Sequence, residues 1–140
     1  MIDTIMDKTT MIDTIMDRVN GDAALVRRGR YVSLDFLVGV GGAEYIFRID
    51  RGRIEFIAPR DKAMTSGHFT IRAESETWAE FWKPTPRRDY HDLFSMFAAG
   101  TAQLDGDVTP FMQNIRYFKD VLATPRPSGT TGIEVSAEEG

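Results

Sequence analysis

The apolar residues of this chain change their spacing near residue 75, and that change limits the folds open to it. Before this point, apolar and polar side chains alternate in four stretches: residues 32–40, 45–49, 54–58 and 68–73. Alternation places successive side chains on opposite faces of a strand. After this point, apolar residues recur at every third or fourth position, which is the spacing of one helix face. The sequence therefore predicts a sheet followed by helices, with one further short strand over residues 101–105.

Glycine-containing turns connect the first three predicted strands. Gly41-Gly42 follows the first strand, and Asp50-Arg51-Gly52 follows the second. Such turns are typical of hairpins, because glycine accepts the positive φ angles that a tight turn needs. We expect a three-strand antiparallel meander, then a loop over residues 59–67 that leads to the fourth strand.

Capping residues predict where the first two short helices begin and end. Asp22 is placed to cap a helix that ends at Gly29. Thr77 and Glu80 have the spacing of a capping box, which predicts a helix that begins after Thr77 and ends before Pro84.

Two more helices are predicted in the last third of the chain. Asp89 is placed to cap the first, and Gly100 supplies its left-handed stop. Thr109 is expected to cap the second, with Pro110 at its first position. The apolar face of this final helix is expected to carry Phe111, Met112, Ile115, Phe118, Val121 and Leu122.

The chain begins with a near-perfect repeat, because residues 1–10 and residues 11–20 share the string MIDTIMD. Ten residues at about 100° each leave the two copies on different sides of a straight helix, so one copy packs and the other does not. We expect residues 1–10 to be a duplicated extension, 11–124 the domain and 125–140 a flexible tail. An amphipathic docking role for the extra copy stays open.

Composition narrows the classes of function. A chain of 140 residues has room for one domain, and its net charge of −4 gives no reason to expect a nucleic-acid partner. The absence of cysteine excludes disulfides and a cysteine nucleophile, and two histidines leave little material for a zinc site. We expect no metal or cofactor, no transmembrane segment and a cytoplasmic location.

The order of elements resembles the sterol carrier protein type two family, also called the sterol-binding or lipid-transfer fold. The resemblance covers residues 19–123. The strings that carry it are VNGDAALVRRG, YIFRIDRGRIEF, HFTIRAESETWAEFW and FAAGTAQLDGDVTPFMQNIRYF.

This resemblance implies an α+β fold in which helices pack on one face of a five-stranded, mostly antiparallel sheet and enclose an apolar tunnel. It implies non-enzymatic binding or transfer of a lipid, sterol, fatty-acyl or terpenoid ligand, with a homodimer or a partner enzyme as an open possibility. The residues at positions that match the tunnel are Trp78, Phe81, Trp82, Phe94, Phe97, Met112, Ile115 and Phe118. Tyr90 is a further candidate ligand contact.

Polar residues between the two middle helices suggest a site for the polar end of a ligand. Lys83, Arg87 and Arg88 are candidates to meet an anionic head group, in a stretch longer and more polar than the resemblance implies. His91 is a further possible polar contact. It is also the candidate proton carrier of an alternative hypothesis, a small isomerase or lyase, in which Asp92 or a residue from another element orients the imidazole.

A third hypothesis is that the chain is a protein-protein interaction module. It rests on the spare MIDTIM segment and on the apolar helices, whose groove would accept a partner helix or a second copy of the chain. Asp105 and Asp107 flank Gly106, and we expect them to brace the last helix rather than to act as a catalytic pair. Asp35 faces away from the apolar stripe of the first strand, and its role is left open.

Overall fold

The computed structural model describes residues 12–60 and 67–126, arranged as a five-stranded sheet with helices. The strands are β1 (Ser33–Val40), β2 (Ala43–Asp50), β3 (Arg53–Pro59), β4 (Phe69–Ala73) and β5 (Ala102–Gly106). The helices are one over residues 12–20, α2 (Ala23–Arg28), α3 (Ser75–Phe81), α4 (Leu93–Ala99), α5 (Thr109–Gln113) and α6 (Ile115–Ala123). The duplicated segment over residues 1–10 and the tail after residue 126 lie outside the described residues.

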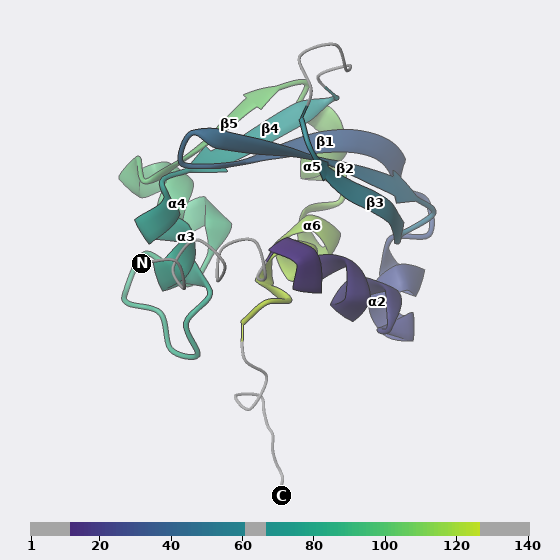
Figure 1. The fold of residues 1–140 in the computed structure, drawn as a ribbon, viewed down its shortest axis with the longest axis horizontal. Coiled ribbons are helices and arrows are strands. Elements are labelled where there is room, and N and C mark those ends of the chain that lie inside the picture. The colour runs from purple at the N-terminus through teal and green to yellow at the C-terminus, as the bar shows by residue number, and fades with distance from the viewer. Residues whose placement is uncertain (1–11, 61–66, 127–140) are drawn as a thin grey trace, which may run out of the picture.

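The sheet has the strand order β3-β2-β1-β4-β5. Only the β1–β4 pair is parallel among its four pairings, and the other three are antiparallel. The helices gather on one side of the sheet (Figure 1). The predicted fold class is therefore confirmed: an α+β domain with a mostly antiparallel sheet and helices on one face.

Aromatic rings fill the layer between the sheet and the helices. We call Phe36, Phe47, Phe69, Phe111 and Phe118 the phenylalanine cluster; all five are fully buried. The ring centroids of Phe36 and Phe69 lie 5.1 Å apart, and the Phe118 ring meets the Phe69 ring edge-on at 5.2 Å. These are favourable arrangements of aromatic rings, so the cluster joins β1 and β4 to the final helices.

The third strand presents a different face to the core from the one predicted. Alternation over residues 54–58 predicts that Ile54 and Phe56 share a face, and this is wrong because the β2–β3 register shifts between Arg48 and Ile49, a β-bulge that leaves Glu55 of β3 unpaired in the ladder. The register shift turns Ile54 and Ile57 toward the core. Phe56 lies on the opposite face, where its ring sits 4.9 Å from the Arg48 guanidinium.

Two predicted helix starts are also corrected. α3 begins two residues before Thr77, with Glu74 at the N-cap position, so Thr77 lies inside the helix and is buried. Asp92 caps α4, because its carboxylate accepts hydrogen bonds from the amides of Phe94 and Ser95, at 3.1 and 3.3 Å. Asp89 instead has a left-handed φ of 74°. The stop at Gly100 is confirmed.

The final helix is not continuous. It divides into α5 and α6 at Asn114, whose φ of −130° is outside the helical range and whose side chain donates a hydrogen bond to the Pro110 carbonyl at 2.9 Å. The residue that precedes α5 is Val108 rather than Thr109. Because of the break, Tyr117 is fully buried, whereas Ile115 is only partly buried.

Tyr117 ties α6 to the turn between β2 and β3. Its buried hydroxyl donates a hydrogen bond to the Gly52 carbonyl at 2.7 Å. The ring lies against Gly29, where an added Cβ would be only 2.3 Å from it. Glycine at position 29 therefore makes room for the tyrosine that closes this end of the domain.

We predict that Tyr117→Phe lowers the free energy of unfolding by about 1 to 3 kcal/mol, because the buried Gly52 carbonyl loses its partner. Tyr45→Phe is the control, since the Tyr45 hydroxyl makes no hydrogen bond within the described residues. Burial also raises the pKa of Tyr117. A folded-state pKa above the unfolded value of about 10 means that this stability is complete below pH 10 and is lost as pH rises. Urea unfolding at a series of pH values should therefore show the unfolding free energies of wild type and Tyr117→Phe converging above pH 10. A difference between them that stays constant with pH would contradict this role of the Tyr117 hydroxyl.

Candidate functional site

The predicted ligand residues of α3 form a group of their own. Trp78, Phe81 and Trp82 are buried, and the Trp78 ring contacts the Phe81 ring at 5.6 Å and the Trp82 ring at 5.2 Å. The Trp78 indole donates a hydrogen bond to the Gly39 carbonyl, and the Trp82 indole donates one to the Leu122 carbonyl, both at 2.8 Å. Both indole N–H groups are thus used to fasten α3 to β1 and α6.

A second group gathers around Phe111, which was predicted to face the core but not to contact a ligand. Phe94, Phe97 and Phe118 approach its ring with centroid separations of 5.9, 6.2 and 5.8 Å. Phe94 and Phe97 are only partly buried, so this group reaches the surface. Met112, in contrast, is 47% exposed.

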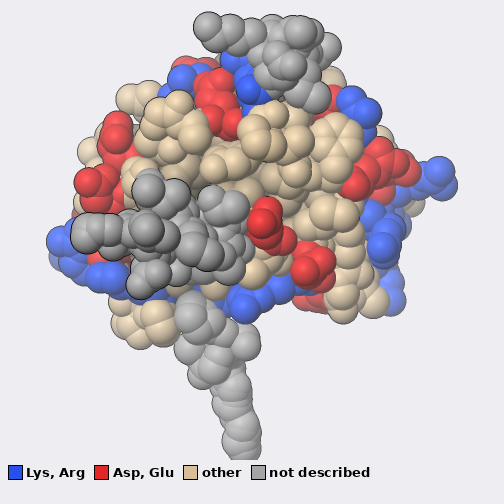
Figure 2. All heavy atoms as spheres, viewed as in Figure 1, with Lys and Arg blue, Asp and Glu red and all other residues tan. Residues whose placement is uncertain are grey.

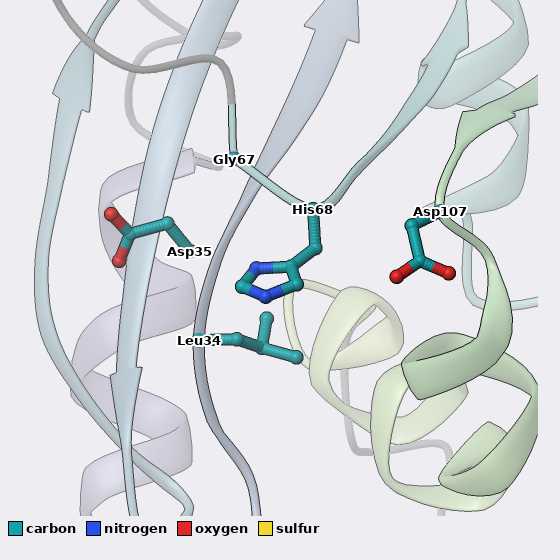
Figure 3. A pocket seen from close by; sticks show the side chains of 5 residues that line it. All are labelled: Leu34, Asp35, Gly67, His68 and Asp107. Carbon is teal, nitrogen blue, oxygen red and sulfur yellow. The ribbon is translucent and has the colours of Figure 1, made fainter.

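A pocket of about 510 Å³ opens at one end of the sheet, and no sequence pattern had predicted it (Figure 3). It lies where β1 begins, where the chain enters β4 and where β5 has ended. We call it the His68 pocket; its lining residues are Leu34, Asp35, Gly67, His68 and Asp107.

Two glycines allow the three chain segments of this pocket to lie side by side. Gly67 and Gly106 have left-handed φ angles of 82° and 96°. A Cβ at Gly67 would lie 2.9 Å from the Asp35 carbonyl, and one at Gly106 would lie 2.7 Å from the His68 carbonyl. The His68 amide donates to the Asp35 carbonyl at 2.9 Å, and the Asp107 amide donates to the His68 carbonyl at 2.7 Å. His68 is thereby fixed between the start of β1 and the end of β5.

The His68 pocket borders the buried core of the domain. Leu34 lines the pocket and also packs against the buried core. The pocket therefore has an apolar wall that is continuous with the interior of the domain.

The polar groups of the pocket differ in how they are paired. The Asp35 carboxylate binds Arg48 through two hydrogen bonds of 2.9 Å, which raise the pKa of Arg48. Asp107 accepts a hydrogen bond from the Thr109 amide at 3.2 Å, so it braces the start of α5 as expected. Within the described part of the chain, the His68 imidazole has no hydrogen-bond partner. Figure 3 shows the Asp35 carboxylate turned away from the imidazole, with Asp107 on the other side of the ring.

Comparison with solved structures identifies this architecture. A crystal structure of sterol carrier protein 2 superposes with a TM-score of 0.65 at 12% sequence identity, over 84% of this chain and 94% of that one. This chain has the sterol carrier protein 2 fold. A conserved hypothetical protein from Thermus thermophilus, described as possibly a sterol carrier protein, has a TM-score of 0.57 at 14% identity, over 84% of this chain and 87% of its own.

A ubiquinone synthesis protein, UbiJ-SCP2, has the same sterol carrier protein 2 fold, with a TM-score of 0.55 at 16% identity. The match covers 81% of this chain and 85% of that chain. No family model matches the sequence, and no curated protein sequence matches it significantly. The resemblance that the order of elements suggested is therefore confirmed for the fold.

The cations predicted for an anionic head group meet a protein carboxylate instead. Glu80 is only 6% exposed; Lys83 lies 2.9 Å from its carboxylate, and the Arg87 amide donates to it at 2.8 Å. The hydrogen bond from Lys83 lowers the pKa of Glu80. The Arg87 guanidinium also lies over the Tyr90 ring at 4.8 Å. Of the three predicted cations, Arg88 alone has no ion pair with a described residue.

His91 lacks the carboxylate partner that a proton carrier would need. The Asp92 carboxylate caps α4 and forms an ion pair of 2.5 Å with Lys119, so it does not orient the exposed imidazole. The backbone of His91 has a structural contact, because its carbonyl accepts a hydrogen bond from Arg126 at 3.4 Å.

Arg126 anchors the chain just beyond α6. Its guanidinium donates two hydrogen bonds to the Phe81 carbonyl, at 3.0 and 2.7 Å, and burial lowers its pKa. Pro125 is buried as well. The packed part of the chain thus continues two residues past the predicted boundary at residue 124.

The described residues were also compared with what nucleic-acid binding, a membrane span and a metal site require. Acidic and basic side chains occur together around the edge of the face in Figure 2, which leaves no extended basic surface there for nucleic acid. Over residues 12–60 and 67–126, no helix has the length and apolar character that crossing a bilayer requires. The same residues contain no group of three metal-ligating side chains.

We predict that the double variant Lys83→Met/Arg87→Met melts roughly 2 to 5 °C below wild type at pH 7, because the buried Glu80 carboxylate loses its cations. Arg88→Met is the control and should melt like wild type. Since pairing lowers the folded pKa of Glu80, the stability it provides is present above the unfolded pKa of about 4.3 and is lost as pH falls. The melting temperatures of wild type and the double variant should therefore converge in acid. A difference between them that persists at low pH would contradict this role of Glu80.

Proposed function

We propose that this protein binds and transfers a hydrophobic small molecule, such as a lipid, sterol, fatty-acyl or terpenoid compound, without chemical conversion. The observation that carries the proposal is the position of the His68 pocket, which borders the buried core through Leu34. Its volume of about 510 Å³ falls in the range of roughly 300 to 1,000 Å³ that small-molecule sites occupy.

The ligand body would lie between the sheet and the last helices. The partly buried side chains Leu34, Phe94, Phe97 and Ile115 are the first apolar surface that a ligand meets, and Phe118 lies deeper. The cluster rings already touch one another, so an apolar ligand enters only by displacing rings from their mutual contacts. In this proposal the remaining predicted contacts are the α3 group, Tyr90 and Met112, which extend the site away from the pocket.

The named relatives by fold support the choice of test ligands. One is a sterol carrier protein, and another is named for ubiquinone synthesis. A panel should therefore contain a sterol, a fatty-acyl compound and a quinone with an isoprenoid chain.

The first test is native mass spectrometry of the freshly purified full chain, followed by organic extraction and identification of released molecules. A bound apolar molecule of discrete mass is the expected result. A protein that is empty, and that also fails to take up every member of the panel, would contradict the proposal.

We predict that Leu34→Trp weakens binding of a fluorescent apolar probe at least tenfold, because the bulkier indole occupies the floor of the His68 pocket. Ala43→Trp is the matched control, since Ala43 is an exposed strand residue that pairs with Val40 at the opposite end of β1. Fluorescence titration measures both affinities, and circular dichroism checks that both variants fold. Unchanged affinity in folded Leu34→Trp would remove the pocket from the binding route.

A further inference from the structure

We propose that the His68 pocket holds the polar end of the ligand and selects an uncharged hydroxyl group over a carboxylate or phosphate. The ligand class is then a long-chain, polycyclic or terpenoid alcohol rather than a fatty acid or an acyl phosphate. This inference rests on the proposed function, because it names the ligand class for the same site.

The first argument is the charge of the pocket. The ionisable side chains that line it are two carboxylates, Asp35 and Asp107, and one imidazole. Arg48 offsets Asp35 through a two-pronged ion pair at 2.9 Å, which leaves that guanidinium engaged. Arg48 itself does not line the pocket, and no Lys or Arg is among the lining residues that the structure describes. Among the described residues, an anionic ligand end would therefore face Asp107 without a cation to compensate, which is unfavourable.

The second argument is the hydrogen-bonding capacity that remains. One oxygen of Asp107 accepts from the Thr109 amide at 3.2 Å, and the other has no partner among the described residues. The His68 imidazole is likewise without a partner there. A neutral imidazole offers one donor and one acceptor, and a carboxylate offers only acceptors. A hydroxyl can donate to Asp107 and accept from His68, whereas a carboxylate can only accept.

The third argument is that the cations suggested for an anionic head group lie far from the pocket along β1. Lys83 and Arg87, which the sequence suggested for an anionic head group, are joined to Glu80 at 2.9 and 3.5 Å. Glu80 belongs to α3, whose ring group is fastened to Gly39 near the other end of β1. The His68 pocket lies at the start of β1, so these cations do not serve it.

The apolar side of the pocket completes the fit to an alcohol. Figure 3 shows the His68 ring projecting toward Leu34, with the Asp107 side chain nearby. Leu34 packs against the buried core, so the carbon skeleton of the ligand would continue from the pocket toward the phenylalanine cluster.

The test compares 1-hexadecanol with hexadecanoate, which have the same chain length, as competitors of a fluorescent apolar probe at pH 8. We expect wild type to bind the alcohol at least tenfold more tightly, a difference of about 1.4 kcal/mol. Asp107→Asn should reduce that preference at least threefold, mainly by improving hexadecanoate binding. Asparagine also accepts a hydrogen bond at a helix start, so the variant retains the brace on α5.

Asp105→Asn is the matched control. Asp105 is an exposed carboxylate two residues away that pairs with Arg72 at 3.4 Å and does not line the pocket, so its removal should leave the alcohol preference unchanged. His68→Leu should weaken hexadecanol binding and leave hexadecanoate binding nearly unchanged.

The outcomes separate the two proposals. Probe binding with no alcohol preference, or a preference that Asp107→Asn leaves intact in a folded protein, would overturn the inference and leave the carrier function standing. Failure of probe, alcohol and acid alike to bind would overturn both.

Discussion

The contact between the Phe69 ring on the sheet and the Phe118 ring on α6 is the interaction on which the rest of the structure depends. The two rings meet edge-on at 5.2 Å, and Phe36 contacts both. Phe69 and Phe118 are far apart in sequence, so their contact closes the domain by bringing the final helices onto β1 and β4. Removing one buried phenylalanine ring typically costs about 3 to 5 kcal/mol, a large part of the stability of a small domain.

The same packing decides where a ligand has room. Because the phenylalanine cluster fills the layer between sheet and helices, the open volume lies at its edge, where Gly67 and Gly106 let three backbone segments approach closely. Hydrogen bonding agrees with this contrast between a filled interior and an open edge. The buried indole groups and Glu80 are engaged within the protein, whereas the exposed His68 imidazole and one oxygen of the exposed Asp107 have no partner among the described residues.

Much of the fold was predictable from local pattern, and the errors have identifiable causes. Strand alternation, the glycine turns and the change to helical spacing predicted the element order correctly. The bulge after Arg48 and the helix break at Asn114 were missed, because neither interrupts the run of apolar residues. Asp89 and Asp92 are equally good capping residues by type. Only the packed chain shows that Asp92 receives the helix amides and pairs with Lys119. The candidate site was predicted least well, since the His68 pocket joins residues from three separate segments.

The sequence by itself determined the strands, the turns and the apolar character of the helices, because these depend on neighbours a few residues apart. It also determined that the interior would be aromatic. The tertiary structure alone decided which aromatic rings pack against one another, which cations neutralise Glu80 and where open space remains. Those outcomes depend on contacts between residues that are distant in the chain, such as Asp107 with His68, and no local pattern encodes the register that brings them together.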